Sequence, residues 1–293
     1  MGPFTYIGVP IDSVRRRGGA EHAPATLREL GLPAALGSED RGDLDVRIRG
    51  EERDPETGLL ASADVLRVTA TIRTAVAGLV GDGARPFLAG GCCAELPGAL
   101  AGARDALGPI ALIHLDGHLD LYDGETSLTG EAADMPISVA LGLGPAAWVE
   151  IAGGPSVEPQ RLALIGFNDR TESIEHGMRQ PETLDPPPTL RPAADLHEAP
   201  APAAAAVLER LAPTPLWLHF DVDVLDQKVF PATDYPMPGG LDWNELTAAL
   251  RPLLNSPHLI GTSLACYAPD KDPDLACGRA LVQALSETLN QAK

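Results

Sequence analysis

The stretch that decides the fold is Ile110-Ala-Leu-Ile-His114-Leu-Asp116-Gly-His118-Leu-Asp120, in which an apolar run leads directly into aspartates and histidines. A second stretch, Leu216-Trp-Leu-His219-Phe-Asp221-Val-Asp223, repeats this arrangement further along the chain. Short apolar runs flanked by loop residues are typical of buried parallel strands. If the two strands are neighbours, four carboxylates and an imidazole converge where their carboxyl ends meet.

That much negative charge is costly to bury together, so we expect a divalent cation to neutralise it. Oxygen-rich ligands with one or two nitrogens favour Mn²⁺ or a similar ion. Each motif alone is equally compatible with a solvated loop or an aspartate that caps a helix. The matching strand-end context of the two motifs favours the metal site.

Apolar segments alternate with amphipathic or Ala-rich segments along the chain. We expect strands at Phe4–Val9, Pro86–Ala89, Ile110–Leu115, Leu162–Gly166, Leu216–Phe220 and Leu259–Ala265. We expect helices at Pro24–Leu30, Ser62–Leu79, Ala94–Ala103, Pro136–Leu143, Ala203–Leu211, Trp243–Leu253 and Asp274–Asn290. This alternation predicts an α/β fold with a mainly parallel sheet covered on both faces, in a single domain over residues 1–293. The Pro-rich stretch Asp185–Ala205 is expected to be an extended loop before a helix.

Composition narrows the class of protein. The net charge of −19 disfavours nucleic acid and anionic membranes as partners. No apolar run is long enough for a transmembrane helix, and the first residues lack the pattern of a signal peptide, so a cytoplasmic protein is expected. The four cysteines have no CxxC spacing, which argues against a zinc knuckle and favours free thiols.

Taken together, the motifs resemble those of the arginase/agmatinase (ureohydrolase) family, nearly from end to end. The matching blocks are Gly8-Val-Pro10, Gly18-Gly19, Pro24-x-x-Leu27-Arg28, Gly90-Gly91, Asp116-Gly-His118-Leu-Asp120, Gly166-Phe-Asn-Asp169, Phe220-Asp221-Val-Asp223-Val-Leu-Asp226, Pro231-Ala-Thr233 and Pro238-Gly-Gly-Leu241. The resemblance implies a three-layer αβα sandwich that binds two Mn²⁺ ions, which activate water to attack a guanidino carbon and release urea. It also implies a small-molecule substrate and a homo-oligomer, a trimer or a hexamer.

The resemblance further implies the roles of individual residues. Asp116 and Asp221 would bridge the two metals, and His118 and Asp223 would complete the shell of one of them. Asp120 and Cys93 would complete the shell of the other, and Asp120 would also orient the attacking water.

The first departure from the family is Cys93, which stands where a metal-binding histidine is usual. A thiolate is a softer ligand and would favour Zn²⁺ or Fe²⁺ at this position. Alternatively the thiol stays neutral and that metal is weakly bound or absent, or Cys93 is simply a small buried residue. A branch of the family that acts on N-hydroxyarginine-type substrates also has a cysteine here.

Two further differences from the family concern residues expected to contact the substrate. Ala133 replaces a histidine that passes a proton to the leaving amine, so Glu131 or Asp134 could take over, or the leaving group needs no help. Both acids could instead cap the helix near Pro136. Cys266 replaces a glutamate that pairs with the guanidinium; it could form a redox pair with Cys93, but two unrelated buried thiols is the favoured interpretation.

The expected substrate follows from which of the family's substrate-contacting residues this sequence retains and which it replaces. Ser127 and Thr129 fall on positions that contact an α-carboxylate, and Asp169 on one that holds an α-amino group, although Tyr122 replaces a usual asparagine. We therefore expect a metal-dependent amidinohydrolase acting on an amino-acid-like guanidine, N-hydroxylated or otherwise modified. The alternatives are hydrolysis of an amide, urea or formimino compound, or a metal-binding protein without catalytic activity.

Overall fold

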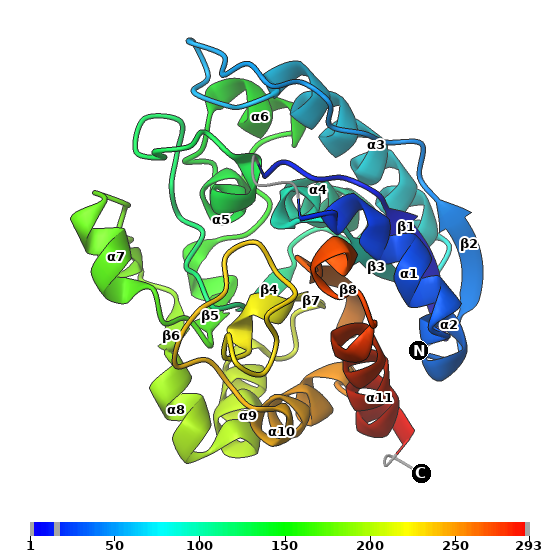
Figure 1. Ribbon diagram of the computed structural model, residues 1–293. Helices are drawn as coiled ribbons and strands as arrows, with labels where there is room; N and C mark the ends of the chain where they lie inside the picture. The colour runs from blue at the N-terminus through cyan, green and yellow to red at the C-terminus, as the bar shows by residue number, and fades with distance from the viewer. Residues whose placement is uncertain (1–2, 15–17, 291–293) are drawn as a thin grey trace.

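A computed structural model describes residues 3–14 and 18–290, and it has three layers with a parallel sheet in the middle (Figure 1). The strand order is β2-β1-β3-β8-β7-β4-β5-β6. The strands are β1 (Phe4–Val9), β2 (Glu39–Asp43), β3 (Arg85–Gly90), β4 (Ala111–Leu115), β5 (Leu162–Ile165), β6 (Thr189–Arg191), β7 (Leu216–Asp221) and β8 (Leu259–Ala265). The predicted α/β sandwich is therefore confirmed.

Helices cover both faces of the sheet (Figure 1). They are α1 (Ala23–Glu29), α2 (Leu32–Ala35), α3 (Ser62–Gly81), α4 (Leu96–Leu107), α5 (Pro136–Ala140), α6 (Ala146–Ile151), α7 (Arg170–Glu175), α8 (Ala193–Glu198), α9 (Pro200–Leu211), α10 (Trp243–Leu254) and α11 (Ala276–Asn290). Alternate residues of β1 enter different cores: Phe4 and Tyr6 pack with α1 and α9–α11, whereas Ile7 and Val9 pack with α3–α6. This two-residue alternation produces the three layers.

The pairing of β4 with β7 brings the two Asp-containing motifs together. β4 and β7 pair in parallel, with His114 opposite His219 and Leu115 opposite Phe220. The aspartates that follow these strands therefore emerge side by side at the same edge of the sheet, as expected for neighbouring parallel strands.

The six predicted strands are present, with ends that differ by at most one residue, but two strands are additional. β2 is exposed along most of its length and carries Glu39-Asp-Arg-Gly-Asp43, so it has no apolar pattern. β6 is only three residues long. The prediction of an extended loop over Asp185–Ala205 is wrong, because this stretch contains β6, α8 and the first turn of α9. Pro200 and Pro202 begin α9 rather than prevent it, since a proline in the first turn forfeits no helical hydrogen bond.

The helix predictions were right in place and less accurate in length. The expected helix Ala94–Ala103 is a short 3-10 turn, η2 (Cys93–Glu95), followed by α4. The short helices α2, α6, α7 and α8 were not predicted. Met1 and Gly2, which begin the segment without a signal-peptide pattern, lie outside the described residues.

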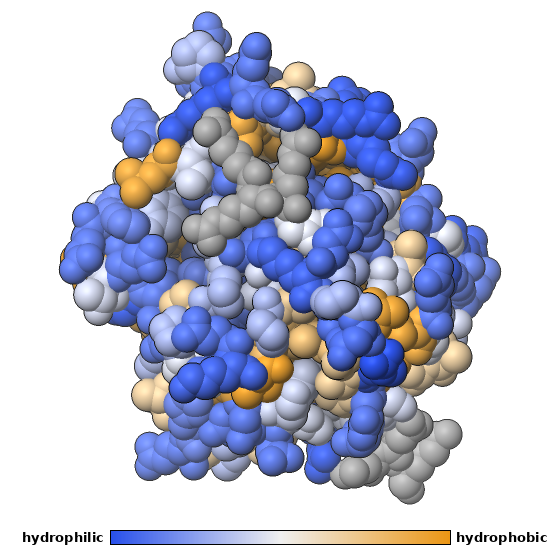
Figure 2. All heavy atoms as spheres, viewed as in Figure 1, coloured by the Kyte–Doolittle hydropathy of each residue, from blue (hydrophilic) through white to orange (hydrophobic). Residues whose placement is uncertain are grey.

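Hydrophilic residues dominate the face seen in Figure 2, with apolar residues in small, separate groups. None of the helices in residues 3–14 and 18–290 is both long and apolar enough to cross a membrane.

Candidate metal centre

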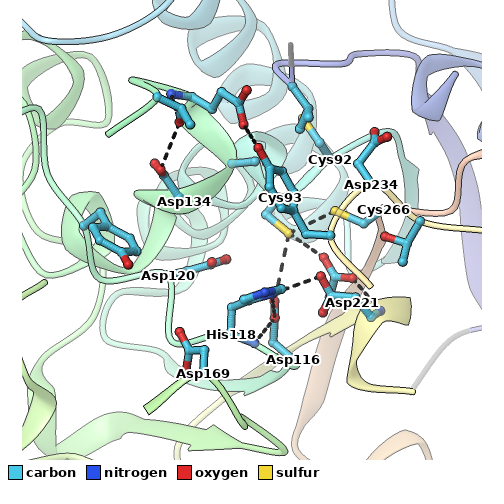
Figure 3. Close-up of a pocket in the computed structure, with 18 of the residues that line it drawn as sticks. Cys92, Cys93, Asp116, His118, Asp120, Asp134, Asp169, Asp221, Asp234 and Cys266 are labelled. Atoms are coloured by element: carbon cyan, nitrogen blue, oxygen red, sulfur yellow. Dashed lines mark hydrogen bonds and ion pairs between the residues drawn. The ribbon is translucent and has the colours of Figure 1, made fainter. Parts of the chain in front are cut away.

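A pocket of about 180 Å³ opens at the carboxyl ends of the central strands (Figure 3). Its lining includes Cys93 after β3, Asp116 after β4, Asp221 and Asp223 at the end of β7, and Cys266 after β8. His118, Asp120, Thr129, Glu131, Ala133, Asp134 and Asp169 also line it. The structure thus brings nearly all the predicted site residues to one place. Ser127 is the exception, since it is buried behind the wall and does not line the pocket.

The same backbone turn orients the two central aspartates. Asp116 Oδ1 accepts a hydrogen bond from the backbone amide of His118 at 2.7 Å, and Asp221 Oδ1 accepts one from the amide of Asp223 at 2.8 Å. An aspartate that binds the amide two residues ahead has its carboxylate fixed by its own chain. Asp116 and Asp221 are therefore held in the same orientation relative to the residue two positions later.

The second oxygens of these carboxylates face the other polar groups of the pocket. Asp116 Oδ2 lies 3.2 Å from His114 Nε2, and Asp221 Oδ2 accepts from Cys93 Sγ at 2.8 Å. Asp223 Oδ2 lies 3.1 Å from His118 Nδ1.

Gly117 permits the two motifs to approach closely. Its backbone amide donates to Asp223 Oδ1 at 3.1 Å, and a Cβ at this position would lie 2.6 Å from the Asp223 carbonyl oxygen. Any side chain at residue 117 would therefore force the two motifs apart.

Among the residues that the structure describes, three groups of side chains have their ligand atoms within 4.8 Å of one another, and Asp116 belongs to all three. The groups are Cys93, Asp116, His219 and Asp221; His114, Asp116 and Asp120; and Asp116, His118 and Asp223. Carboxylate oxygens with imidazole nitrogens and one thiol form a donor set that fits divalent transition metals.

The pKa values of the buried carboxylates also indicate that the centre is built to bind a cation. Burial and the neighbouring carboxylates raise the pKa of Asp116 to about 8, and burial together with Asp223 raises the pKa of Asp221 well above its usual value. Burial likewise raises the pKa of Asp120. Burial would also raise the pKa of Asp223, but His118 and the hydrogen bonds that Asp223 accepts outweigh burial, so the pKa of Asp223, unlike those of Asp116, Asp120 and Asp221, is lowered. The described lining residues include no lysine or arginine, so a divalent ion is the counter-charge that this cluster fits.

The imidazoles of His114 and His219 have no expected role in the motifs, but the structure places both at the centre. Their rings are stacked with centroids 5.1 Å apart, and both side chains are fully buried. His114 Nε2 lies 3.5 Å from Asp120 Oδ2, and His219 Nε2 lies 3.4 Å from Cys93 Sγ. The available signal was a histidine two residues before the first aspartate of each motif, in an otherwise apolar strand.

Two of the four cysteines, Cys93 and Cys266, are in contact in the pocket. All four are free, and Cys93 Sγ lies 3.5 Å from Cys266 Sγ, so the interpretation of two unrelated thiols is wrong. Cys266 has a φ of 66° and Asp120 a φ of 51°, in the left-handed region that non-glycine residues seldom adopt. Such strain is often found at functional sites.

The opposite wall carries the two acids considered as proton carriers. Glu131 Oε2 accepts from the Tyr235 hydroxyl at 2.7 Å, and Asp134 Oδ2 accepts from Ser127 Oγ at 2.8 Å. Burial raises the pKa of Asp134 to about 7. Neither acid caps α5, which has no side-chain cap, so that alternative is wrong.

Asp169 is a buried residue that also lines the pocket (Figure 3). Its Oδ2 accepts from the backbone amide of Leu119 at 3.1 Å, while its buried Oδ1 has no hydrogen-bond partner among the described residues. A buried carboxylate oxygen without a donor is suited to bind a cationic group of a ligand.

Comparisons with known proteins agree with this geometry. The sequence profile described as the Arginase family matches residues 3–289. An arginase of Bacillus caldovelox is 28% identical over 268 residues, covering 86% of each chain, and the solved structure of arginase from that organism superposes with a TM-score of 0.85 at 23% identity over 98% of each chain. An N(omega)-hydroxy-L-arginine amidinohydrolase of Streptomyces lavendulae is 31% identical over 154 residues, which is 53% of this chain and 50% of that one.

Proposed function

The chain belongs to the arginase family, whose hydrolases act on C–N bonds of amidino compounds, and we propose that its own substrate is a modified, amino-acid-like guanidine, above all an N-hydroxylated one. One contrast carries the proposal: the carboxylates of the centre are all present and converge, whereas Ala133 and Cys266 alter the wall that would receive the guanidinium. The Streptomyces lavendulae relative, named for a hydroxylated arginine, supports this choice.

The donor set indicates which residues would hold the metals. Asp116 and Asp221 would contact both ions, His118 and Asp223 would hold one, and Cys93 and Asp120 the other. Mn²⁺ suits the oxygen-rich side, and Zn²⁺ or Fe²⁺ suits the side with Cys93. When bound, the ions supply Lewis acidity and lower the pKa of a water molecule.

Loss of the guanidinium-pairing carboxylate favours a less basic substrate. Cys266 has no charge to offer a guanidinium as long as its thiol is protonated. The hydrogen bond with Cys93 lowers the pKa of that thiol, but burial and the nearby Asp221 and Asp223 together raise it well above its usual value. An N-hydroxyl group withdraws electrons and makes a guanidine less basic, so a neutral thiol is a tolerable neighbour for it.

Proton transfer to the leaving nitrogen would fall to Asp134. Its pKa of about 7 lets it hold a proton near neutral pH, and its buried Oδ1 has no partner among the described residues. Ser127 donates to the other oxygen and fixes the carboxyl group. Asp120 would orient the attacking water by hydrogen bonding.

The far end of the substrate would lie toward Asp169 and Thr129. The unpartnered Asp169 Oδ1 can accept from an α-ammonium group, and Thr129 also lines the pocket. Thr129 Oγ1 is 3.4 Å from Asp134 Oδ2, a long contact that a substrate carboxylate could replace. A homo-oligomer, trimeric or hexameric, remains part of the proposal and is testable by light scattering.

The test is a substrate panel with Mn²⁺-loaded protein. The panel contains arginine, N-hydroxyarginine, agmatine, a formimino amino acid, an amide and a urea, with release of urea, hydroxyurea or ammonia measured. We expect N-hydroxyarginine to be hydrolysed fastest, and the Asp120→Asn variant to be inactive. Turnover of the formimino compound, amide or urea alone would establish another C–N hydrolase, and no turnover by metal-replete protein would establish a silent family member.

A further inference from the structure

His219 is a fully buried imidazole at the metal centre that the ligand set above does not use. It extends from β7 toward residue 93, where the family's usual histidine is replaced by Cys93. We infer that His219 and Cys93 bind the same metal ion, together with Asp116 and Asp221, and that this mixed nitrogen, sulfur and oxygen site selects Zn²⁺ over Mn²⁺. The inference rests on the metal centre of the proposed function and concerns which ion occupies it.

The distances fit a shared ion. His219 Nε2 lies 3.4 Å from Cys93 Sγ, and the ligand atoms of all four residues lie within 4.8 Å of one another. In a tetrahedral zinc site with Zn–S near 2.3 Å and Zn–N near 2.0–2.1 Å, the sulfur and nitrogen ligands are about 3.5 Å apart. The observed separation therefore matches one edge of such a site without movement of either side chain.

The neighbouring strand holds the imidazole in a suitable orientation. His219 Nδ1 lies 2.7 Å from Ser263 Oγ on β8, and the same hydroxyl accepts from Trp217 Nε1 at 3.0 Å. A serine oxygen has two lone pairs, so it can accept from both the indole and the Nδ1–H of the imidazole. That arrangement leaves the lone pair of Nε2 for a metal, as in most histidine metal sites.

The two neighbouring thiols are not joined in a disulfide, so Cys93 Sγ is free to be a ligand. Cys93 Sγ and Cys266 Sγ are 3.5 Å apart, whereas a disulfide requires a separation of about 2.05 Å. Cys266 Sγ is thus at the distance of a hydrogen-bonding neighbour of the Cys93 sulfur. A thiolate and an imidazole on one ion are a softer set than the carboxylates around His118, which is the basis for preferring Zn²⁺ there.

Cobalt reports on these ligands directly. Co²⁺ added to the metal-free protein should give a near-ultraviolet sulfur-to-cobalt charge-transfer band, which Cys93→Ser should abolish. His219→Asn should keep the band, change the visible cobalt spectrum and weaken Co²⁺ binding about tenfold or more. Cys277→Ser and His258→Gln alter a cysteine and a histidine that do not line the pocket, and should behave as wild type.

Metal competition tests the selectivity. With equimolar Zn²⁺ and Mn²⁺, the preference for Zn²⁺ at the thiol-containing site should fall about tenfold or more in both Cys93→His and His219→Asn. X-ray absorption of the wild-type protein with one equivalent of Zn²⁺ needs no variant, and should show sulfur and imidazole scatterers in the same shell.

The outcomes separate this inference from the proposed function. A zinc shell without sulfur, or an unchanged cobalt spectrum in folded His219→Asn, overturns the inference even if guanidines are hydrolysed. A mixed sulfur and imidazole shell in a protein that hydrolyses no guanidine supports the inference and overturns the proposed function.

Discussion

Asp116→Asn should stabilise the metal-free protein and at the same time abolish its high-affinity metal binding. In the absence of metal, burial and the nearby carboxylates raise the pKa of Asp116 from 3.8 to about 8. Asparagine has nearly the same shape and carries no charge, so it avoids this electrostatic penalty. Functional residues that destabilise a fold are a recognised consequence of sites built for a ligand.

The size of the expected stabilisation follows from the linkage between protonation and folding. Each pKa unit corresponds to 1.36 kcal/mol, so taking up a proton at pH 7 on a group with an unfolded-state pKa of 3.8 costs about 4 kcal/mol. Relaxation of the metal-free site reduces this cost of protonation. We therefore expect Asp116→Asn to raise the free energy of unfolding by about 2–4 kcal/mol.

The pH dependence has a definite sign. Between pH 6.5 and about 8 the folded, metal-free protein holds a proton on Asp116 that the unfolded chain has lost. The unfolded state binds fewer protons, so the free energy of unfolding falls as pH rises, by about 1.4 kcal/mol per pH unit for this group. The Asn variant should lack this contribution, and its advantage over wild type should therefore grow with pH.

Urea denaturation of chelator-treated protein across this pH range is the assay, repeated with saturating Mn²⁺. With metal the order should reverse, because wild type gains binding energy that the variant cannot. Asp45→Asn, an exposed site, is the matched control and should change stability by less than about 0.5 kcal/mol. A destabilised metal-free Asp116→Asn, or equal pH slopes in variant and wild type, would refute the reasoning.

Three further predictions follow from the pocket and its support. Asp134→Asn should lower kcat about 100-fold without loss of metal by elemental analysis, and the wild-type kcat should fall above about pH 7 as the Asp134 proton is lost; an unchanged profile in the variant excludes this role. Asp169→Asn should raise KM for an α-amino substrate about tenfold and leave KM closer to wild type for 5-guanidinopentanoate, which lacks the α-amino group; an equal rise in KM for both substrates would contradict the assignment. Gly91→Ala should lower the free energy of unfolding by more than about 3 kcal/mol in a denaturation experiment, because its Cβ would lie 1.5 Å from the Ile11 carbonyl oxygen; a stable variant would show that the two segments can separate.

The sheet was predictable from sequence because its central strands are continuous apolar runs that end in polar residues. β4 and β7 are of this kind, and the aspartates at their carboxyl ends are the residues from which a metal site could be predicted. β2 and β6 were not predictable by the same signal, since one lies exposed at the edge and the other is very short. Edge strands are defined by backbone pairing, which leaves little mark on side-chain pattern.

The site was predictable only where a residue's role follows from its place in a motif. The contact between Cys93 and His219 joins residues on β7 and after β3, and depends on how the strands pair. Ser127 shows the opposite limit, because its position fits substrate contact, yet its hydroxyl binds Asp134 behind the wall. Neither tertiary relation is encoded in local spacing.

The most direct test of the account is a crystal structure of the Mn²⁺-loaded protein with anomalous data collected at the manganese edge. We predict an anomalous peak in contact with Asp116 and Asp221, on the side of His118 and Asp223. Manganese bound only elsewhere on the protein, or no peak in fully loaded crystals, would contradict the claim that these aspartates form a metal centre.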